Sequence, residues 1–247
     1  MSRRRRCVSI FPEMKNRKVT PKQLLEQIEK LRNELFVTDV QFQLFVELKK
    51  AAPNYKEEIR ATPLFWDYTM RAHIDMVVLR LCRLYDSDNK TISLPNFVLT
   101  VEANRELFSK AAFIERNKNS PSLEWAVKYN RDLSPKFLEE SKKIWSSRNP
   151  LVKNLLIMRN HFVAHLNHEL TFGDAELFQK KFPLHFKDIE KLIKDGFSLL
   201  NDVSSVFGGS HFSGLEGSNY PFDDFKFILE KLKTCLKRRE EKMFEDE

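Results

Sequence analysis

The feature that most constrains this chain is a set of prolines that directly follow helix-capping residues. A capping side chain accepts a hydrogen bond from a free N–H of the first helical turn, and a proline in that turn gives up no bond because it has no N–H. Five of the ten prolines occur in this way, in the pairs Thr20-Pro21, Thr62-Pro63, Ser120-Pro121, Ser134-Pro135 and Asn149-Pro150. No alternating run of Val, Ile and Thr competes with them. The pattern predicts an all-α protein with no sheet beyond an incidental hairpin.

Apolar periodicity between these starts predicts the extent of each helix. The expected helices cover residues 21–35, 38–50, 63–86, 95–116, 122–131, 135–147, 150–168, 183–207 and 222–242. Four of the six glycines fall between Phe207 and Pro221, which predicts a flexible loop at 208–221. We therefore expect a basic flexible tail at 1–18 and a single helical domain at 19–247, with that loop inside it.

Composition narrows the class of protein. Phenylalanine is abundant at 21 residues and glycine scarce at 6, which favours packed helices over turn-rich β structure. No apolar run is long enough to span a membrane, and no apolar stretch follows the N-terminal arginines as it would in a secretory signal. Cys7, Cys82 and Cys235 are isolated from one another, an arrangement that argues against a disulfide scaffold. The expected location is the cytoplasm.

The net charge of +7 is concentrated at the N-terminus. Residues 1–18 contain seven arginines and lysines and one glutamate, so they account for six of the seven net positive charges. Such a tail gives a protein non-specific affinity for phosphates, or is simply solvated. The charge alone therefore does not identify a nucleic-acid-binding protein.

The predicted helix at 63–86 is apolar on nearly all sides. Asp67, Arg71 and Asp75 form its one narrow polar stripe, with the arginine between two carboxylates. A helix of this kind is expected in the middle of a bundle. Its arginines are expected to be charge-paired structural groups.

The predicted helix at 150–168 carries the residues best suited to chemistry. Arg159 projects from the middle of an apolar stripe, where an unpaired charge would be costly. His161, His165 and His168 lie on the opposite side, spaced by four and three residues. Three interpretations remain open for these histidines, namely zinc binding, a structural hydrogen-bonded cluster, and general acid–base catalysis near neutral pH.

The segment Arg-Asn-His-Phe-Val-Ala-His at 159–165 resembles the motif of the HEPN superfamily (higher eukaryotes and prokaryotes nucleotide-binding). That motif has an arginine, then a polar residue, then a histidine after four to six residues; here five intervene and Asn160 is the polar residue. Residues 79–97 resemble the helix-and-turn block that precedes the motif in the branch typified by the abortive-infection U proteins of bacteria. The resemblance covers roughly residues 60–170.

The resemblance implies an antiparallel helical bundle that forms a homodimer, with both copies of the motif facing each other. It implies a metal-independent endoribonuclease with no cofactor, in which His165 acts as acid–base group, Arg159 stabilises the phosphorane charge and Asn160 orients the scissile phosphate or the histidine. Arg159 and His165 are separated by about 120° around an ideal helix, and pairing of two subunits is the simplest way to bring them together. His161 and His168 match no motif position.

We therefore expect a HEPN-type endoribonuclease that cleaves RNA by attack of the 2′-hydroxyl, in the role of a toxin or antiphage effector. The expected partners are RNA, a second copy of the chain and a nucleotidyltransferase-type antitoxin. The alternatives are a catalytically inactive helical module that dimerises or binds RNA, and a nucleotide-binding regulator.

Overall fold

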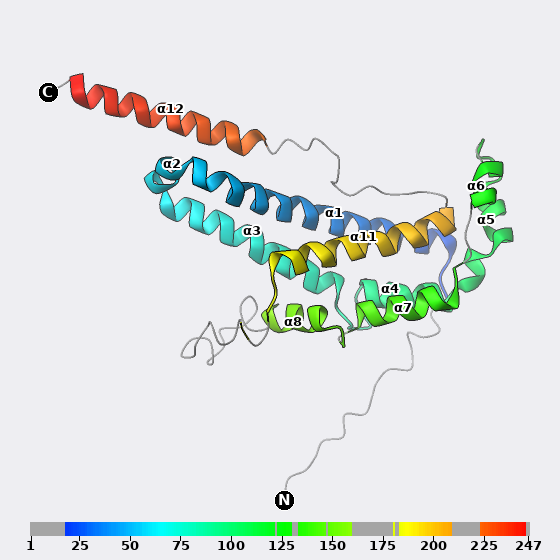
Figure 1. Ribbon diagram of the computed structural model, residues 1–247. Helices are drawn as coiled ribbons and strands as arrows, with labels where there is room; N and C mark the ends of the chain where they lie inside the picture. Colours follow the sequence, from blue (N-terminus) through cyan, green and yellow to red (C-terminus); the bar gives the residue numbers. More distant parts are fainter. Residues whose placement is uncertain are drawn as a thin grey trace, which may run out of the picture. The chain divides into compact units, whose positions relative to one another are not determined.

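The computed structural model describes residues 18–121, 123–129, 133–146, 148–159, 180, 183–208 and 223–245. The regular elements in these ranges are all helices, which confirms the predicted all-α class (Figure 1). They are α1 (Pro21–Ala51), η2 (Ala52–Asn54), α2 (Lys56–Ala61), α3 (Pro63–Leu84), α4 (Leu94–Ala103), η3 (Arg105–Phe108), α5 (Lys110–Asn117), α6 (Leu123–Tyr129), α7 (Pro135–Trp145), α8 (Pro150–Met158), α11 (Phe186–Gly208) and α12 (Asp223–Glu245), where η marks a short 3₁₀ helix. No described helix is both long and apolar enough to cross a membrane. The predicted tail and the predicted 208–221 loop lie almost wholly outside the described residues.

Contacts along the chain cluster into two compact units. The first comprises Met1–Asn33, Arg83–Asn154 and Lys194–Phe212, and the second comprises Glu34–Cys82, Leu155–Ile193 and Ser213–Glu247. The divisions fall inside α1, α3, α8 and α11, so each of these helices contributes residues to both units. The single domain expected at 19–247 remains a prediction.

Three of the capping residues act as predicted. Thr20 and Gln23 form a reciprocal capping box: the Thr20 hydroxyl accepts from the Gln23 N–H at 3.2 Å, and the Gln23 side chain accepts from the Thr20 N–H at 2.9 Å. Ser134 accepts from the Phe137 N–H at 3.1 Å, and Asn149 accepts from the Leu151 N–H at 3.0 Å. Local sequence chemistry therefore fixes where these helices begin.

The prediction of two helices at 21–35 and 38–50 was wrong, because α1 continues without a break. Leu35 is fully buried and Phe42 is 3% exposed, so apolar side chains face the interior on both sides of the expected gap. Thr38, also fully buried, donates its hydroxyl to the Glu34 carbonyl at 2.6 Å. Burial of this face outweighs the low helix propensity of the β-branched residues there.

The helix predicted at 95–116 is divided into α4, η3 and α5. The Asn104 side chain donates to the Thr100 carbonyl at 2.8 Å and accepts from the Val19 N–H at 3.0 Å, so it binds backbone groups at the end of α4. Ser109 then caps α5 by accepting from the Ala112 N–H at 3.2 Å. These side-chain bonds compete with a continuous helix.

The expectation that the helix at 63–86 is buried on nearly all sides holds only for its C-terminal half. Val77 and Leu81 are fully buried, whereas Leu64 and Tyr68 are 71% and 68% exposed. Arg71 pairs with Asp67 at 3.1 Å on the exposed surface, which confirms the expected charge pairing of this arginine.

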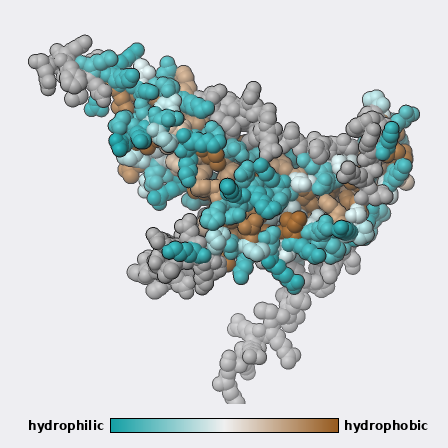
Figure 2. All heavy atoms as spheres, in the orientation of Figure 1, coloured by the Kyte–Doolittle hydropathy of each residue, from teal (hydrophilic) through white to brown (hydrophobic). Residues whose placement is uncertain are grey.

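The cores of the two units consist of aromatic and aliphatic side chains. In the first unit, the rings of Tyr85 and Trp145 lie 5.3 Å apart, and those of Phe108 and Phe207 lie 5.6 Å apart. In the second, one buried cluster joins α1, α3 and α12 through Leu48, Ala51, Trp66, Phe225 and Leu229. Hydrophobic side chains are visible between hydrophilic ones on the face drawn in Figure 2.

Candidate functional site

Helix α8 leads into the predicted motif and is anchored in the core. Val152 and Leu155 are both fully buried. The Cys82 thiol, at the end of α3, donates to the Leu155 carbonyl over 3.6 Å. Buried apolar side chains and this contact therefore position the helix that precedes the motif.

Arg159 follows the end of α8 directly, four residues after the fully buried Leu155. Its side chain is half-buried, as are those of Ile157 and Met158. The arginine of the predicted motif is therefore partly buried, and its place on the apolar stripe stays a prediction. A guanidinium in this position carries a permanent charge into a partly desolvated setting.

The remaining residues of the predicted site, Asn160 and His165, lie outside the described residues, as do His161 and His168. The distance between Arg159 and His165 and the choice between the three interpretations of the histidines remain predictions. Within the described ranges, no three His, Cys, Asp or Glu side chains come together in a way that would hold a metal ion. That observation leaves the three motif histidines untested.

The turn within residues 79–97 uses its polar side chains to fold its own backbone. Asp86 accepts from the Asp88 N–H, and Asp88 accepts from the Lys90 N–H, each at 3.0 Å. Asn96, only 5% exposed, donates to the carbonyls of Asp88 and Thr91 at 2.6 and 3.0 Å. This block therefore has a structural role, which is to hold the connection between α3 and α4.

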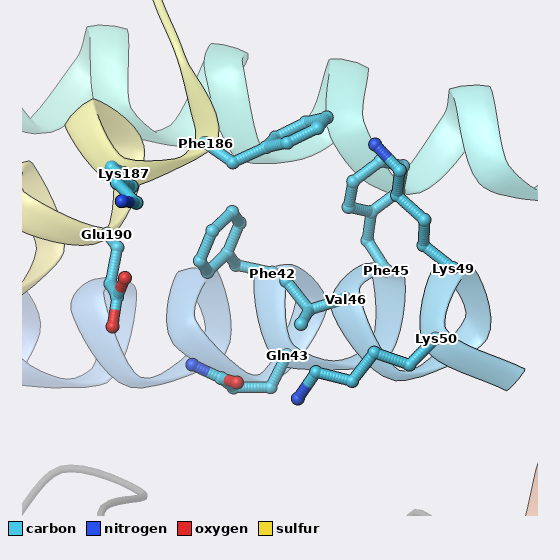
Figure 3. A pocket seen from close by; sticks show the side chains of 9 residues that line it. All are labelled: Phe42, Gln43, Phe45, Val46, Lys49, Lys50, Phe186, Lys187 and Glu190. Atoms are coloured by element: carbon cyan, nitrogen blue, oxygen red, sulfur yellow. The ribbon is translucent and has the colours of Figure 1, made fainter.

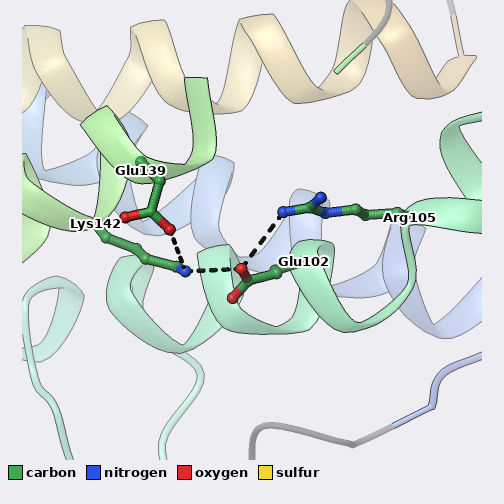
Figure 4. A network of polar contacts seen from close by, with 4 residues as sticks. All are labelled: Glu102, Arg105, Glu139 and Lys142. Atoms are coloured by element: carbon green, nitrogen blue, oxygen red, sulfur yellow. Dashed lines mark hydrogen bonds and ion pairs between the residues drawn. The ribbon is translucent and has the colours of Figure 1, made fainter. Parts of the chain in front are cut away.

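A network of four charged side chains joins α4 to α7 (Figure 4). Lys142 lies 2.7 Å from Glu102 and 3.0 Å from Glu139, while Arg105 lies 3.4 Å from Glu102. The hydrogen bond from Lys142 lowers the pKa of Glu139, and the hydrogen bond to Glu102 raises the pKa of Lys142. Each cation here faces a carboxylate, so the network is suited to holding two helices together.

His73, on α3, is half-buried, and burial lowers its pKa below the ordinary value. The imidazole is therefore neutral near pH 7. Nothing in the sequence pattern had marked His73, and among the described residues it belongs to no group of acids, histidines and cysteines that could hold a metal ion.

A hollow of about 500 Å³ lies between α1 and the start of α11. Phe42 and Phe45 extend from α1 toward Phe186, and the Lys49 ammonium lies 4.2 Å from the centre of the Phe186 ring (Figure 3). The sequence analysis did not identify this hollow. The spacing of Phe42, Phe45 and Lys49 indicates a shared face of α1, but nothing in the sequence pairs that face with a residue about 140 positions later.

Comparison with known proteins gives one family and no individual relative. Neither the curated proteins nor the solved structures include a match to this chain. The family model HEPN_AbiU2, described as AbiU2, matches residues 21–227. The matched region contains both the turn at 79–97 and the motif at 159–165, the two segments on which the resemblance was based. The chain therefore belongs to the AbiU2 family of HEPN proteins, the abortive-infection U branch.

Proposed function

We propose that this protein is a metal-independent endoribonuclease of the HEPN type, acting as a toxin or antiphage effector. The observation that carries the proposal is the family match across residues 21–227, which includes the complete Arg-Asn-His-Phe-Val-Ala-His segment. It is supported by the half-buried position of Arg159 at the end of an anchored helix.

The proposed reaction needs a base, an acid and a group that stabilises negative charge. His165 accepts the proton of a ribose 2′-hydroxyl, and the oxygen forms a bond to the adjacent phosphorus. The bond from phosphorus to the 5′-oxygen breaks, and that oxygen takes up a proton. The products are a 2′,3′-cyclic phosphate and a 5′-hydroxyl, and the step requires no metal or cofactor.

Arg159 is assigned to stabilise the negative charge that develops on the phosphorane. A planar guanidinium grips two phosphate oxygens at once, and its attraction grows as their charge increases toward the transition state. Partial burial strengthens this effect, because less water screens the charge. Asn160 is assigned to orient the phosphate or the histidine.

We further propose that the active form is a homodimer. The half-buried Ile157 and Met158 belong to a second apolar face of α8, beside the stripe that contains Leu155. In a pair of facing motifs, Arg159 of one subunit meets His165 of its partner, and the two copies of His165 serve as base and acid. A nucleotidyltransferase-type antitoxin is the proposed regulatory partner.

The decisive experiment measures cleavage of a 5′-labelled single-stranded RNA by the purified chain in the presence of EDTA. We expect internal cuts that persist with chelator and that disappear when the nucleotide 5′ to the cut carries a 2′-deoxy sugar. We also expect Arg159→Lys to lose more activity than stability, because it keeps the charge and loses the planar fork. Cleavage abolished by EDTA would indicate a metal enzyme. Absence of cleavage would favour the inactive dimerisation or RNA-binding module.

A further inference from the structure

We infer that the hollow between α1 and α11 binds a segment of single-stranded RNA, with a base stacked at Phe186 and the backbone held by Lys49 and Lys187. The inference rests on the proposed function for the choice of RNA, and it adds to it a substrate-binding site apart from the motif. Phe186 and Arg159 both belong to the second compact unit.

The first observation is an accessible ring inside a hollow. Phe42 and Phe45 are 3% and 6% exposed and form part of its wall, whereas Phe186 is 41% exposed. The centres of the Phe45 and Phe186 rings lie 5.1 Å apart at 49°, and the Lys49 ammonium lies 4.2 Å from the centre of the Phe186 ring, so Phe186 is held by α1 and still remains partly accessible. A held, accessible aromatic ring is what base stacking requires.

The second observation is the balance of charge around that ring. Of the described residues that line the hollow, three are lysines (Lys49, Lys50 and Lys187) and one, Glu190, carries a carboxylate. Lys50 lies 2.7 Å from Glu47, but Lys49 and Lys187 form no ion pair with any described carboxylate. Among the described residues, these two cations therefore differ from Lys142, which faces two carboxylates.

Together the two observations favour a single-stranded polyanion over other ligands. A volume of about 500 Å³ lies within the range of small-ligand sites and accommodates the base and sugar of a nucleotide. Cations beside a stacking ring match the alternation of phosphates and bases along an RNA strand. A duplex would hide its bases from Phe186, and an anionic membrane would offer no planar group to stack.

The α12 pair of Phe227 and Lys231 provides a matched control. The Lys231 ammonium lies 5.2 Å from the centre of the Phe227 ring, and Phe227 is 62% exposed. This pair repeats the chemistry of Phe186 and Lys49 without lining the hollow. It therefore separates a built site from any exposed cation beside an aromatic ring.

The test is fluorescence anisotropy with 5′-fluorescein-labelled oligouridylate of twelve nucleotides, using the full chain with His165→Ala to prevent cleavage and EDTA present. Phe186→Leu keeps an apolar side chain and removes the stacking face, so affinity should fall roughly 5- to 150-fold, the range for one stacked base. Lys187→Glu changes an exposed residue that has no ion pair with a described carboxylate, and it should make the negative slope of log affinity against log salt shallower by about 0.7. Phe227→Leu and Lys231→Glu should leave both values unchanged.

The outcomes separate this inference from the proposed nuclease. If the wild type cleaves RNA while Phe186→Leu and Lys187→Glu bind RNA as well as wild type does, the inferred RNA site in the hollow would be wrong. The proposed nuclease activity would stand. If these variants lose RNA binding and the wild type does not cut RNA, the RNA site in the hollow would be supported and the proposed nuclease activity would be wrong. Equal losses of RNA affinity in the α12 control variants would also contradict an RNA site in the hollow. The RNA site would be contradicted as well if the Phe186 and Lys187 variants lost binding to phosphatidylglycerol vesicles while still binding RNA.

Discussion

The turn after α3 and Arg159, which directly follows α8, place their polar side chains in different settings. In the turn, Asp86, Asp88 and Asn96 form hydrogen bonds to the turn's own backbone. Directly after α8, Arg159 is half-buried. The polar side chains of the turn therefore hold its backbone, whereas Arg159 brings a permanent charge into a partly buried position.

The difference separates two reasons for a family to share a segment. Asp86, Asp88 and Asn96 are explained by the fold, because their hydrogen bonds hold the turn's own backbone. Arg159 differs, because a permanently charged side chain is half-buried there. Substitutions in the turn should therefore change stability, and substitutions in the motif should change activity.

The largest expected effect is that of His165→Ala on RNA cleavage. The initial rate should fall by roughly 10²–10⁴, the usual contribution of a positioned general acid or base. The melting temperature should stay at the wild-type value when followed by circular dichroism. His185→Ala, at an exposed residue just before α11, is the matched control and should cleave normally. If His165→Ala cleaved as fast as wild type, the assigned role would be wrong.

The next effect is that of Met158→Asp on assembly. An unpaired carboxylate in a buried subunit contact should raise the dimer dissociation constant by roughly 100-fold or more. Sedimentation velocity across a concentration series measures this shift. Met76→Asp, at a residue 39% exposed on α3, should leave the association unchanged. If the wild type were monomeric at micromolar concentration, the proposal of an active site shared by two subunits would be wrong.

A smaller effect is expected from Asn96→Ala in the turn. The substitution removes two hydrogen bonds from a nearly buried amide, so the free energy of unfolding should fall by about 2 kcal/mol. For a chain of this size the melting temperature should drop by about 4–8 °C. Asn117→Ala, which removes a single bond to the Phe113 carbonyl, should cost about half as much. Cleavage measured well below the melting temperature should be retained, and its loss would contradict a purely structural role.

The smallest effect is expected from Lys142→Gln between α4 and α7. Loss of the partly exposed pair with Glu102 should lower the free energy of unfolding by no more than about 1 kcal/mol. Lys142 also lowers the pKa of Glu139, so the contribution of the Lys142–Glu139 pair is present above the ordinary pKa of 4.5 and is lost as pH falls through the lower folded value. Urea unfolding of wild type and variant should therefore differ at pH 7 and converge toward pH 3. A difference unchanged at pH 3 would show that the charge pairing is not its cause.

The sequence by itself determined the helical class and several helix starts. Thr20, Ser134 and Asn149 cap their helices through bonds to residues no more than three positions away, so these starts depend only on local chemistry. The motif was also readable, because the order and spacing of Arg159, Asn160 and His165 belong to the chain and not to its packing. The family match across 21–227 confirms the resemblance on which that interpretation was based.

Only the tertiary structure decided where helices continue and which distant side chains meet. Leu35 and Phe42 are buried, and their burial carries α1 through a stretch that local propensity interprets as a break. The contact between Asn104 and Val19 helps to end α4 through residues 85 positions apart. The hollow depends most on packing, because Lys49 and Phe186 come into contact only when α11 lies beside α1. Hydrophobic burial acts between segments regardless of their separation in sequence, and a pattern within one segment cannot reveal its partner.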